Sequence, residues 1–278
     1  MIKLVFVTLA LIIGGLNIQA QYFYKDIISN YESQKQWALY KANNIKTIQI
    51  QSYFTDNELD NEFNVVQKNN DAFTKAITTT KTDKEKNVFT IVLYNAQNKV
   101  IKSIDSSETD VATTSIIYND ENRIKAINTT CLSNNNYITT ETHLWFYDKD
   151  GNPNKMFLIK GNADTTIIKF MADGDGNITD EIHERKKIIT ANYMYYYDAA
   201  GNLTDIVRFN EKIKQLLPDL MFTYNTNGTL QKMIQLEPSK NEYHTFVFDY
   251  NPKGLKVEER MYYKKFTQTL GKLVYLYK

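Results

Sequence analysis

Hydrophobic residues recur at every second position along most of the chain, which is the period of a β-strand. The runs that end at Tyr147, Tyr197, Tyr224 and Tyr250 carry aromatic or apolar residues two and four positions before the tyrosine. The positions between them are often apolar as well, as at Phe146. These strands are therefore predicted to be covered on both faces. The strands that follow them alternate apolar with charged residues, so one of their faces is expected to meet water.

A four-residue turn phrase separates the paired runs. It consists of Asp or Asn, two variable residues, and then Gly or Asn, and in most copies it directly follows an aromatic strand end. The opening side chain can bond the backbone two residues on, and the fourth position needs the positive φ that Gly and Asn tolerate. This is the chemistry of a type I turn with a Gly bulge, which joins two antiparallel strands. The fourth positions of the eight copies are Asn57, Asn98, Asn122, Gly151, Gly176, Gly201, Gly228 and Gly254.

This repeat predicts the fold class. From Asn98 onward the copies follow one another at steps of 24 to 29 residues. Residues 47–278 are predicted to form an all-β, antiparallel meander of about eight hairpin repeats, or about sixteen strands, in one large curled sheet. Residues 272–277 are a candidate final strand. The pattern is compatible with an open sheet, a closed sheet or a sandwich.

Two segments depart from the strand period. Residues 21–46 are predicted to contain one N-terminal helix, with Tyr24, Ile27 and Tyr31 near its apolar face, and this helix is expected to cap or cross the sheet. Residues 67–87 are polar, rich in Lys and Thr and without clear period, which predicts a mobile loop.

The first twenty residues have the pattern of a secretory signal peptide. Lys3 precedes a run over residues 4–16 that is apolar apart from Thr8, and Ala20 precedes a polar, aromatic stretch. We expect residues 1–20 to be removed after Ala20, which predicts a secreted or periplasmic protein without a transmembrane helix. A membrane anchor is the alternative, but this run of thirteen residues is shorter than the roughly 20 that span a bilayer.

Composition excludes some classes of partner and of stabilisation. The chain has 33 Lys and Arg against 32 Asp and Glu, so it carries no basic footprint for nucleic acid. Cys131 is the single cysteine, so no intrachain disulfide can form and the core must hold the fold. Cys131 lies in a strand-like run and is interpreted as a small buried residue, with a reactive or intermolecular thiol as the alternative.

Two copies of the turn phrase resemble a known repeat. The segments 146–152, Phe-Tyr-Asp-Lys-Asp-Gly-Asn, and 196–204, Tyr-Tyr-Asp-Ala-Ala-Gly-Asn-Leu-Thr, are similar to the YD repeat of the rearrangement-hotspot (RHS) family. The resemblance implies hairpin-repeat architecture and an exported, often bacterial, setting. Large members of that family resemble hollow β-shells around a toxin, but this chain has no room for a cargo domain. The helix followed by repeats also resembles short exported proteins of the Bacteroidota.

Residues with catalytic or metal-binding chemistry are scattered. His143, His183 and His244 lie in different repeats without a metal-ligand spacing, and we interpret them as part of the repeat structure. The turns that begin at Asp148 and Asp173 concentrate oxygen ligands, but their Gly positions do not match a calcium loop, and turn chemistry explains them. We therefore predict no catalytic residue, no metal and no cofactor.

The aromatic residues suggest a binding role. Trp145, Tyr195, Phe222 and Phe248 occupy equivalent strand positions in neighbouring hairpins and are predicted to form one stripe across the sheet. Such a stripe is either core or, if open, a ligand-binding surface for a carbohydrate, peptide or protein partner. The sequence is thus interpreted as an exported, non-catalytic binding or scaffold protein of the bacterial cell envelope. Three alternatives stay open: an enzyme acting on envelope polysaccharide, an accessory or immunity protein of a toxin system, and a transmembrane β-barrel.

Overall fold

The computed structural model describes residues 22–82, 88–161, 164–210, 214–237, 240, 242–263 and 268–278. The predicted signal peptide, residues 1–20 with its cleavage site after Ala20, lies outside the described residues. Helix α1 spans Lys25–Ala42. The strands are β1 (Thr47–Tyr53), β2 (Asn64–Asn69), β3 (Lys75–Lys81), β4 (Val88–Tyr94), β5 (Val100–Ser106), β6 (Asp110–Tyr118), β7 (Ile124–Ser133), β8 (Ile138–Tyr147), β9 (Pro153–Lys160), β10 (Asp164–Ala172), β11 (Ile178–Arg185), β12 (Ile188–Tyr197), β13 (Leu203–Asn210), β14 (Gln215–Tyr224), β15 (Leu230–Glu237), β16 (Glu242–Tyr250), β17 (Lys256–Tyr263) and β18 (Gln268–Tyr277).

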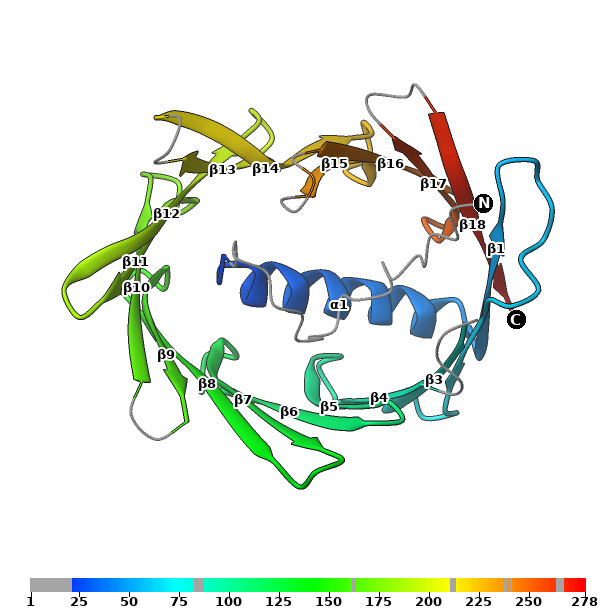
Figure 1. Cartoon of the computed structure of the whole chain (residues 1–278), viewed down its shortest axis with the longest axis horizontal. Coiled ribbons are helices and arrows are strands. Elements are labelled where there is room, and N and C mark those ends of the chain that lie inside the picture. Colours follow the sequence, from blue (N-terminus) through cyan, green and yellow to red (C-terminus); the bar gives the residue numbers. More distant parts are fainter. Residues whose placement is uncertain are drawn as a thin grey trace.

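The described strands form one closed antiparallel β-barrel. Each of the eighteen strands in the described part of the chain pairs with the next in sequence, and β18 pairs with β1 (Figure 1). Ile48 lies opposite Tyr277 in this closing pair, and Tyr53 lies opposite Lys272. The prediction of a curled sheet of about eight hairpins was therefore wrong. Because β1 pairs with β18, the backbone groups at the edges of both strands are hydrogen-bonded, and the sheet formed by the described residues has no exposed edge strand.

The predicted loop over residues 67–87 was also wrong where the structure describes it. The hairpin of β2 and β3 occupies most of this range, with Asn69 opposite Ala76 in the ladder. The segment is polar, but its threonines are β-branched and favour strands. Thr78 is buried on the inner side of the wall. Residues 83–87 lie outside the described residues.

The turn chemistry predicted from the sequence is confirmed. The fourth positions have positive φ, for example 90° at Gly151 and 61° at Asn98. In the turn that begins at Asp148, one carboxylate oxygen accepts the backbone N–H groups of Asp150 and Asn152, both at 2.9 Å. The ladder shifts register at the bulge next to Tyr147. Successive connections of an up-and-down meander alternate between the two ends of the barrel. The seven turns from Asn98 to Gly254 each follow an even-numbered strand and lie at one end, here called the turn end, whereas the turn at Asn57 follows β1 and lies at the other end.

Five tyrosines at strand ends in the described part of the chain make the same contact. Each side chain points into the barrel, and its hydroxyl donates to the backbone carbonyl two residues after the Gly or Asn of the preceding turn. This contact links each hairpin to the one before it and explains why tyrosine recurs here. The pairs, at 2.6 to 2.9 Å, are Tyr118 with Val100, Tyr147 with Ile124, Tyr197 with Ile178, Tyr224 with Leu203 and Tyr277 with Lys256.

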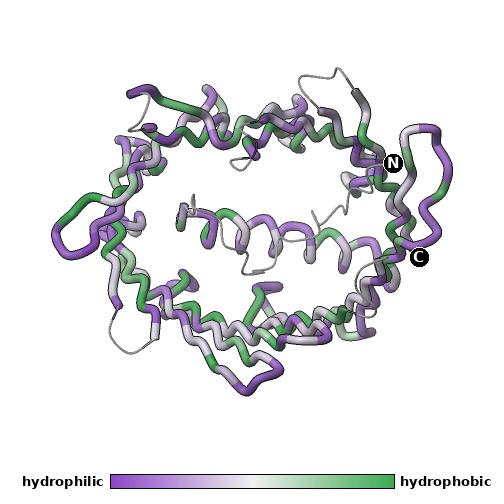
Figure 2. Tube along the Cα trace, viewed as in Figure 1, coloured by the Kyte–Doolittle hydropathy of each residue, from purple (hydrophilic) through white to green (hydrophobic). Residues whose placement is uncertain are grey.

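Hydrophobic and hydrophilic residues alternate along the strands (Figure 2). The barrel wall is one sheet thick, so the outward-pointing residues have no covering layer. Phe146 is 36% exposed and Tyr196 is 46% exposed, so the prediction that these strands are covered on both faces was wrong. Ion pairs also lie on the outer face, including Lys169 with Glu184 at 2.7 Å. Within the described residues, no helix combines the length and the apolar character needed to cross a membrane.

Helix α1 lies across the lumen of the barrel (Figure 1). Trp37 anchors its C-terminal half: the indole stacks on Tyr94 with ring centroids 3.8 Å apart, and its N–H donates to the carbonyl of Phe73 at 3.0 Å. Trp37 and Tyr40 are the buried residues of the helix. The predicted apolar face was wrong at Tyr31, which is 61% exposed, because the helix packs on the wall through its Trp37 side.

Candidate functional site

A buried carboxylate holds the start of α1. Glu181, on the inner face of β11, has no exposed surface. Its Oε1 accepts the backbone N–H of Phe23 at 2.7 Å, and its Oε2 accepts that of Tyr24 at 2.8 Å. The Tyr195 hydroxyl donates to Oε2 at 2.6 Å, and Nε2 of His183 lies 2.6 Å from Oε1. Glu181 thus satisfies amide groups at the helix N-terminus that have no partner within the helix.

A second polar cluster lies beside the first. Nδ1 of His143, on β8, lies 2.5 Å from Oδ2 of Asp26, and its Nε2 lies 2.9 Å from Glu141. Burial acts to lower the pKa of His143, but the charges of and hydrogen bonds to both carboxylates outweigh it and raise the pKa to about 9. The hydrogen bond from His143 lowers the pKa of Glu141 to about 2. The imidazolium therefore ties the first turn of α1 to the wall at neutral pH.

His143 and His183 were predicted to be separate parts of the repeat structure. The structure brings them together around Phe23, whose ring centroid lies 5.1 Å from that of His143 and 5.2 Å from that of His183. His244 lies elsewhere, where its Nε2 is 2.8 Å from Glu237. The convergence depends on a residue outside the repeats, so repeat spacing carried no signal for it. We name the two clusters together the helix latch; its residues are Glu181, His183, Tyr195, His143, Glu141 and Asp26, with the backbone of Phe23 and Tyr24.

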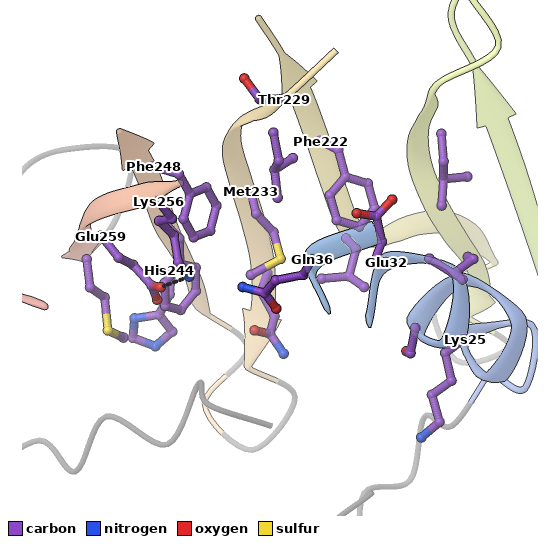
Figure 3. A pocket seen from close by; sticks show the side chains of 18 of the residues that line it. Lys25, Glu32, Gln36, Phe222, Thr229, Met233, His244, Phe248, Lys256 and Glu259 are labelled. Atoms are coloured by element: carbon purple, nitrogen blue, oxygen red, sulfur yellow. Dashed lines mark hydrogen bonds and ion pairs between the residues drawn. The ribbon is translucent and has the colours of Figure 1, made fainter. Parts of the chain in front are cut away.

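The lumen contains a large cavity between α1 and the inner face of β13 to β18, which also reaches residues of β4 to β7 and of the turn after β1. Its volume is about 2830 Å³. From α1, Lys25, Glu32 and Gln36 face it, and Phe222, Met233 and Phe248 lie among the side chains of the strand wall (Figure 3). Its lining includes Gly228 and Gly254 at the turn end and Glu237 and Lys240 at the opposite end. The cavity therefore extends between the two ends of the barrel.

The wall opposite α1 carries an apolar row in register across four strands. Phe222 pairs with Met233, Met233 with Phe246, and Phe246 with Met261. Phe246, Phe248 and Met261 form a hydrophobic cluster separate from the main core, which includes the helix. We name Phe222, Met233, Phe246 and Met261 the apolar row.

A more polar row lies next to it, toward the end of the barrel opposite the turns. Leu220 pairs with Gln235, Gln235 with His244, and His244 with Tyr263. These residues also line the cavity. His244 is 9% exposed, and its Nδ1 has no hydrogen-bond partner in the described structure. We name Gln235, His244 and Tyr263, with the neighbouring Glu237, the polar row.

The four predicted binding residues lie in two environments. Trp145 and Tyr195 are each 3% exposed: the indole stacks on Phe170, and the tyrosine belongs to the helix latch. Phe222 and Phe248 line the cavity. The residues occupy comparable positions in the repeat, but α1 covers only part of the inner wall. The sequence carried no signal for which part the helix covers.

Two other sequence features have definite places. The hydrogen bond from the backbone of Asn152, with others from the same turn, lowers the pKa of Asp148, so this carboxylate serves the turn. In the described residues, no group of three or more His, Cys, Asp or Glu side chains is placed to hold a metal ion. Cys131 is half-buried, rather than buried as predicted, and its side chain lines the cavity.

The fold and the site define a closed β-barrel with an internal helix and a large luminal cavity. No family model matches the chain, and no protein of curated function matches it. A porin-like protein from Bacteroides uniformis is similar in structure, with 10% identity, a TM-score of 0.39, and coverage of 84% of this chain and 98% of that chain. TcdB2-TccC3 without its hypervariable C-terminal region shows 10% identity and a TM-score of 0.36. The match covers 78% of this chain and 12% of that one. Likenesses of this level assign no function.

Proposed function

We propose that the protein is an exported, non-catalytic binding protein of the bacterial cell envelope that holds its ligand in the lumen, between α1 and the wall of β13 to β18. One observation carries the proposal, namely the aromatic-walled cavity of about 2830 Å³. Pockets for drug-sized ligands are roughly 300 to 1,000 Å³, lined by apolar side chains with a few polar groups. This cavity has the same kind of lining and room for a longer ligand.

The helix latch supports the proposal because it fixes one wall of the cavity. Glu181 and His143 attach the start of α1 to the barrel, and Trp37 attaches its second half. A site whose walls are held in place loses less conformational entropy when a ligand binds. The helix therefore serves as a fixed partition that leaves the β13 to β18 side of the lumen open.

The outer face supports a barrel surrounded by water. Arg260 pairs with Asp249 at 2.6 Å and with Glu258 at 2.8 Å, and all three point outward from the wall. A lipid-facing arginine at the bilayer midplane costs about 2 to 4 kcal/mol. These outward charges support a binding surface inside the barrel and disfavour the transmembrane alternative.

An apolar fluorescent probe tests the proposal. Protein expressed from the full sequence and purified is titrated with N-phenyl-1-naphthylamine, whose fluorescence rises in apolar surroundings. We expect saturable binding that Phe222→Ala weakens about fivefold, because a partly buried phenyl ring contributes about 1 kcal/mol of apolar contact.

The matched control is Phe89→Ala, which removes a phenyl ring that is 43% exposed on the outer face of β4. It should leave probe binding unchanged. Absence of saturable binding, or equal loss in both variants, would contradict a luminal site.

A further inference from the structure

The chemistry of the cavity walls defines a ligand class. This inference rests on the proposed function and concerns the same cavity. We propose that the lumen binds a single-chain amphiphile whose apolar chain lies along the apolar row and whose uncharged, hydroxyl-rich head group meets the polar row.

The apolar row is suited to a chain. Phe222, Met233, Phe246 and Met261 cross four strands in continuous register. Phe246 and Met261, with Met233 packed against them, belong to a cluster separate from the core that includes α1, whereas Phe222 packs against that core. Phenyl and thioether groups in alternation make an adaptable surface for a flexible apolar ligand. Among the described residues, no helix or strand fills the space between this cluster and α1 on the other side of the cavity. Phe246 and Met261 are already buried, so a bound chain would cover mainly what Phe222 and Met233 still expose to water, which favours binding.

The polar row specifies the head group. Nε2 of His244 lies 2.8 Å from Glu237, which leaves Nδ1 as the ring nitrogen that can meet a head group. This nitrogen has no partner in the described structure. The exposed amide of Gln235 is its neighbour across the ladder. A head group that supplies several hydroxyl donors would satisfy these groups.

The charges of the lining exclude an anionic head. Among the described lining residues there are nine Asp and Glu against four Lys. Several of these acids are already paired within the protein, such as Glu259 with Lys256 at 2.8 Å and Asp219 with Arg208 at 3.1 Å. The surplus of acids repels a carboxylate or phosphate head, whereas the internal pairing reduces the attraction for a cationic head. A neutral head group fits both observations.

Displacement of the naphthylamine probe tests the inference. The competitors are octyl, decyl and dodecyl maltoside below their micelle concentrations, maltose, dodecanoate and dodecylamine. We expect affinity for the maltosides to rise roughly tenfold for each two methylene groups, which is the increment of a buried chain. Maltose alone should not displace the probe, and dodecanoate and dodecylamine should each bind at least tenfold more weakly than dodecyl maltoside.

Two variants locate the parts of the ligand. Met233→Gln keeps the side-chain length but makes the apolar row polar, and it should reduce the gain from octyl to dodecyl maltoside. Its matched control is Met171→Gln on the outer face, where Met171 is 49% exposed, and it should leave that gain intact. Gln235→Leu should weaken the maltosides about tenfold while the probe binds as before.

The outcomes separate the two proposals. If the probe binds in the lumen but maltose displaces it as well as dodecyl maltoside does, or if dodecanoate or dodecylamine binds as tightly, the ligand class is wrong and the luminal site stands. If none of the competitors displaces the probe, the ligand class is likewise wrong and the luminal site stands. If the probe does not bind at all, the proposed function fails first.

Discussion

Replacement of Glu181 by Gln tests whether the helix latch holds α1 in the barrel. Each carboxylate oxygen of Glu181 accepts two hydrogen bonds: Phe23 N–H and His183 at Oε1, and Tyr24 N–H and the Tyr195 hydroxyl at Oε2. Burial and the adjacent carboxylate raise the pKa of Tyr195 well above its ordinary value, so this hydroxyl keeps its proton and donates. A glutamine retains one acceptor oxygen and presents an NH₂ group to the other pair of donors.

The magnitude follows from the donors that lose their acceptor. A buried donor left without a partner costs about 1 to 3 kcal/mol. Two such donors in Glu181→Gln lower the free energy of unfolding by about 4 kcal/mol. The loss is smaller if the Tyr195 hydroxyl rotates to another acceptor. A matched control lies on the same strand: Glu184 points outward and pairs with Lys169, whose side chain is 52% exposed. Glu184→Gln should cost at most about 1 kcal/mol, as exposed ion pairs do.

Urea unfolding gives the two free energies, and hydrogen exchange resolved by peptide shows where the loss falls. We expect amide protection to drop in α1 of Glu181→Gln before it drops in the strands, because the barrel ladder does not depend on Glu181. Equal stability losses in Glu181→Gln and Glu184→Gln, or unchanged protection of α1, would refute the assignment of Glu181 as the group that holds the helix.

The remaining predictions concern pH and the tyrosine contacts. The folded pKa of His143 is raised to about 9 from an ordinary 6.5, so its contribution to stability is complete below pH 6.5 and is lost as pH rises through 9. The pKa of Glu141 is lowered to about 2 from 4.5, so the contribution of Glu141 to stability is complete above pH 4.5 and is lost as pH falls through 2. Stability curves against pH should therefore decline above neutrality in the wild type and flatten there in His143→Gln; an unchanged slope would contradict the ion pairs. Tyr147→Phe removes the hydroxyl that donates to the Ile124 carbonyl at 2.8 Å and should cost about 1 kcal/mol. The control Tyr137→Phe, at a residue 66% exposed, should be neutral, and denaturant unfolding of both variants decides the point.

Local chemistry made the turns readable from the sequence. An Asx side chain that bonds its own turn, followed three residues later by Gly or Asn, determines the same backbone wherever it occurs, as at Asp148 and Gly151. The strand period is equally local, because side chains alternate between the two faces whatever lies beyond them. These signals predicted antiparallel hairpins and their approximate number, but they carried no information about whether the first and last strands meet.

The aromatic stripe shows where local signals end. Repeat position alone made Trp145, Tyr195, Phe222 and Phe248 equivalent, but the structure separates them into two residues packed in the main core and two that line the cavity, of which Phe248 is also buried. The difference comes from α1, which lies outside the repeats. Whether these residues bind a ligand stays a prediction.

The sequence by itself determined the turns and most of the strands, because each depends on residues a few positions apart. Tertiary structure alone decided the closure of the barrel, the place of α1 and the cavity beside it. The contact of Phe23 with Glu181 joins residues 158 positions apart, and the pairing of β1 with β18 joins the first strand to the last. Such contacts join residues far apart in the sequence, so no short pattern in the chain encodes them.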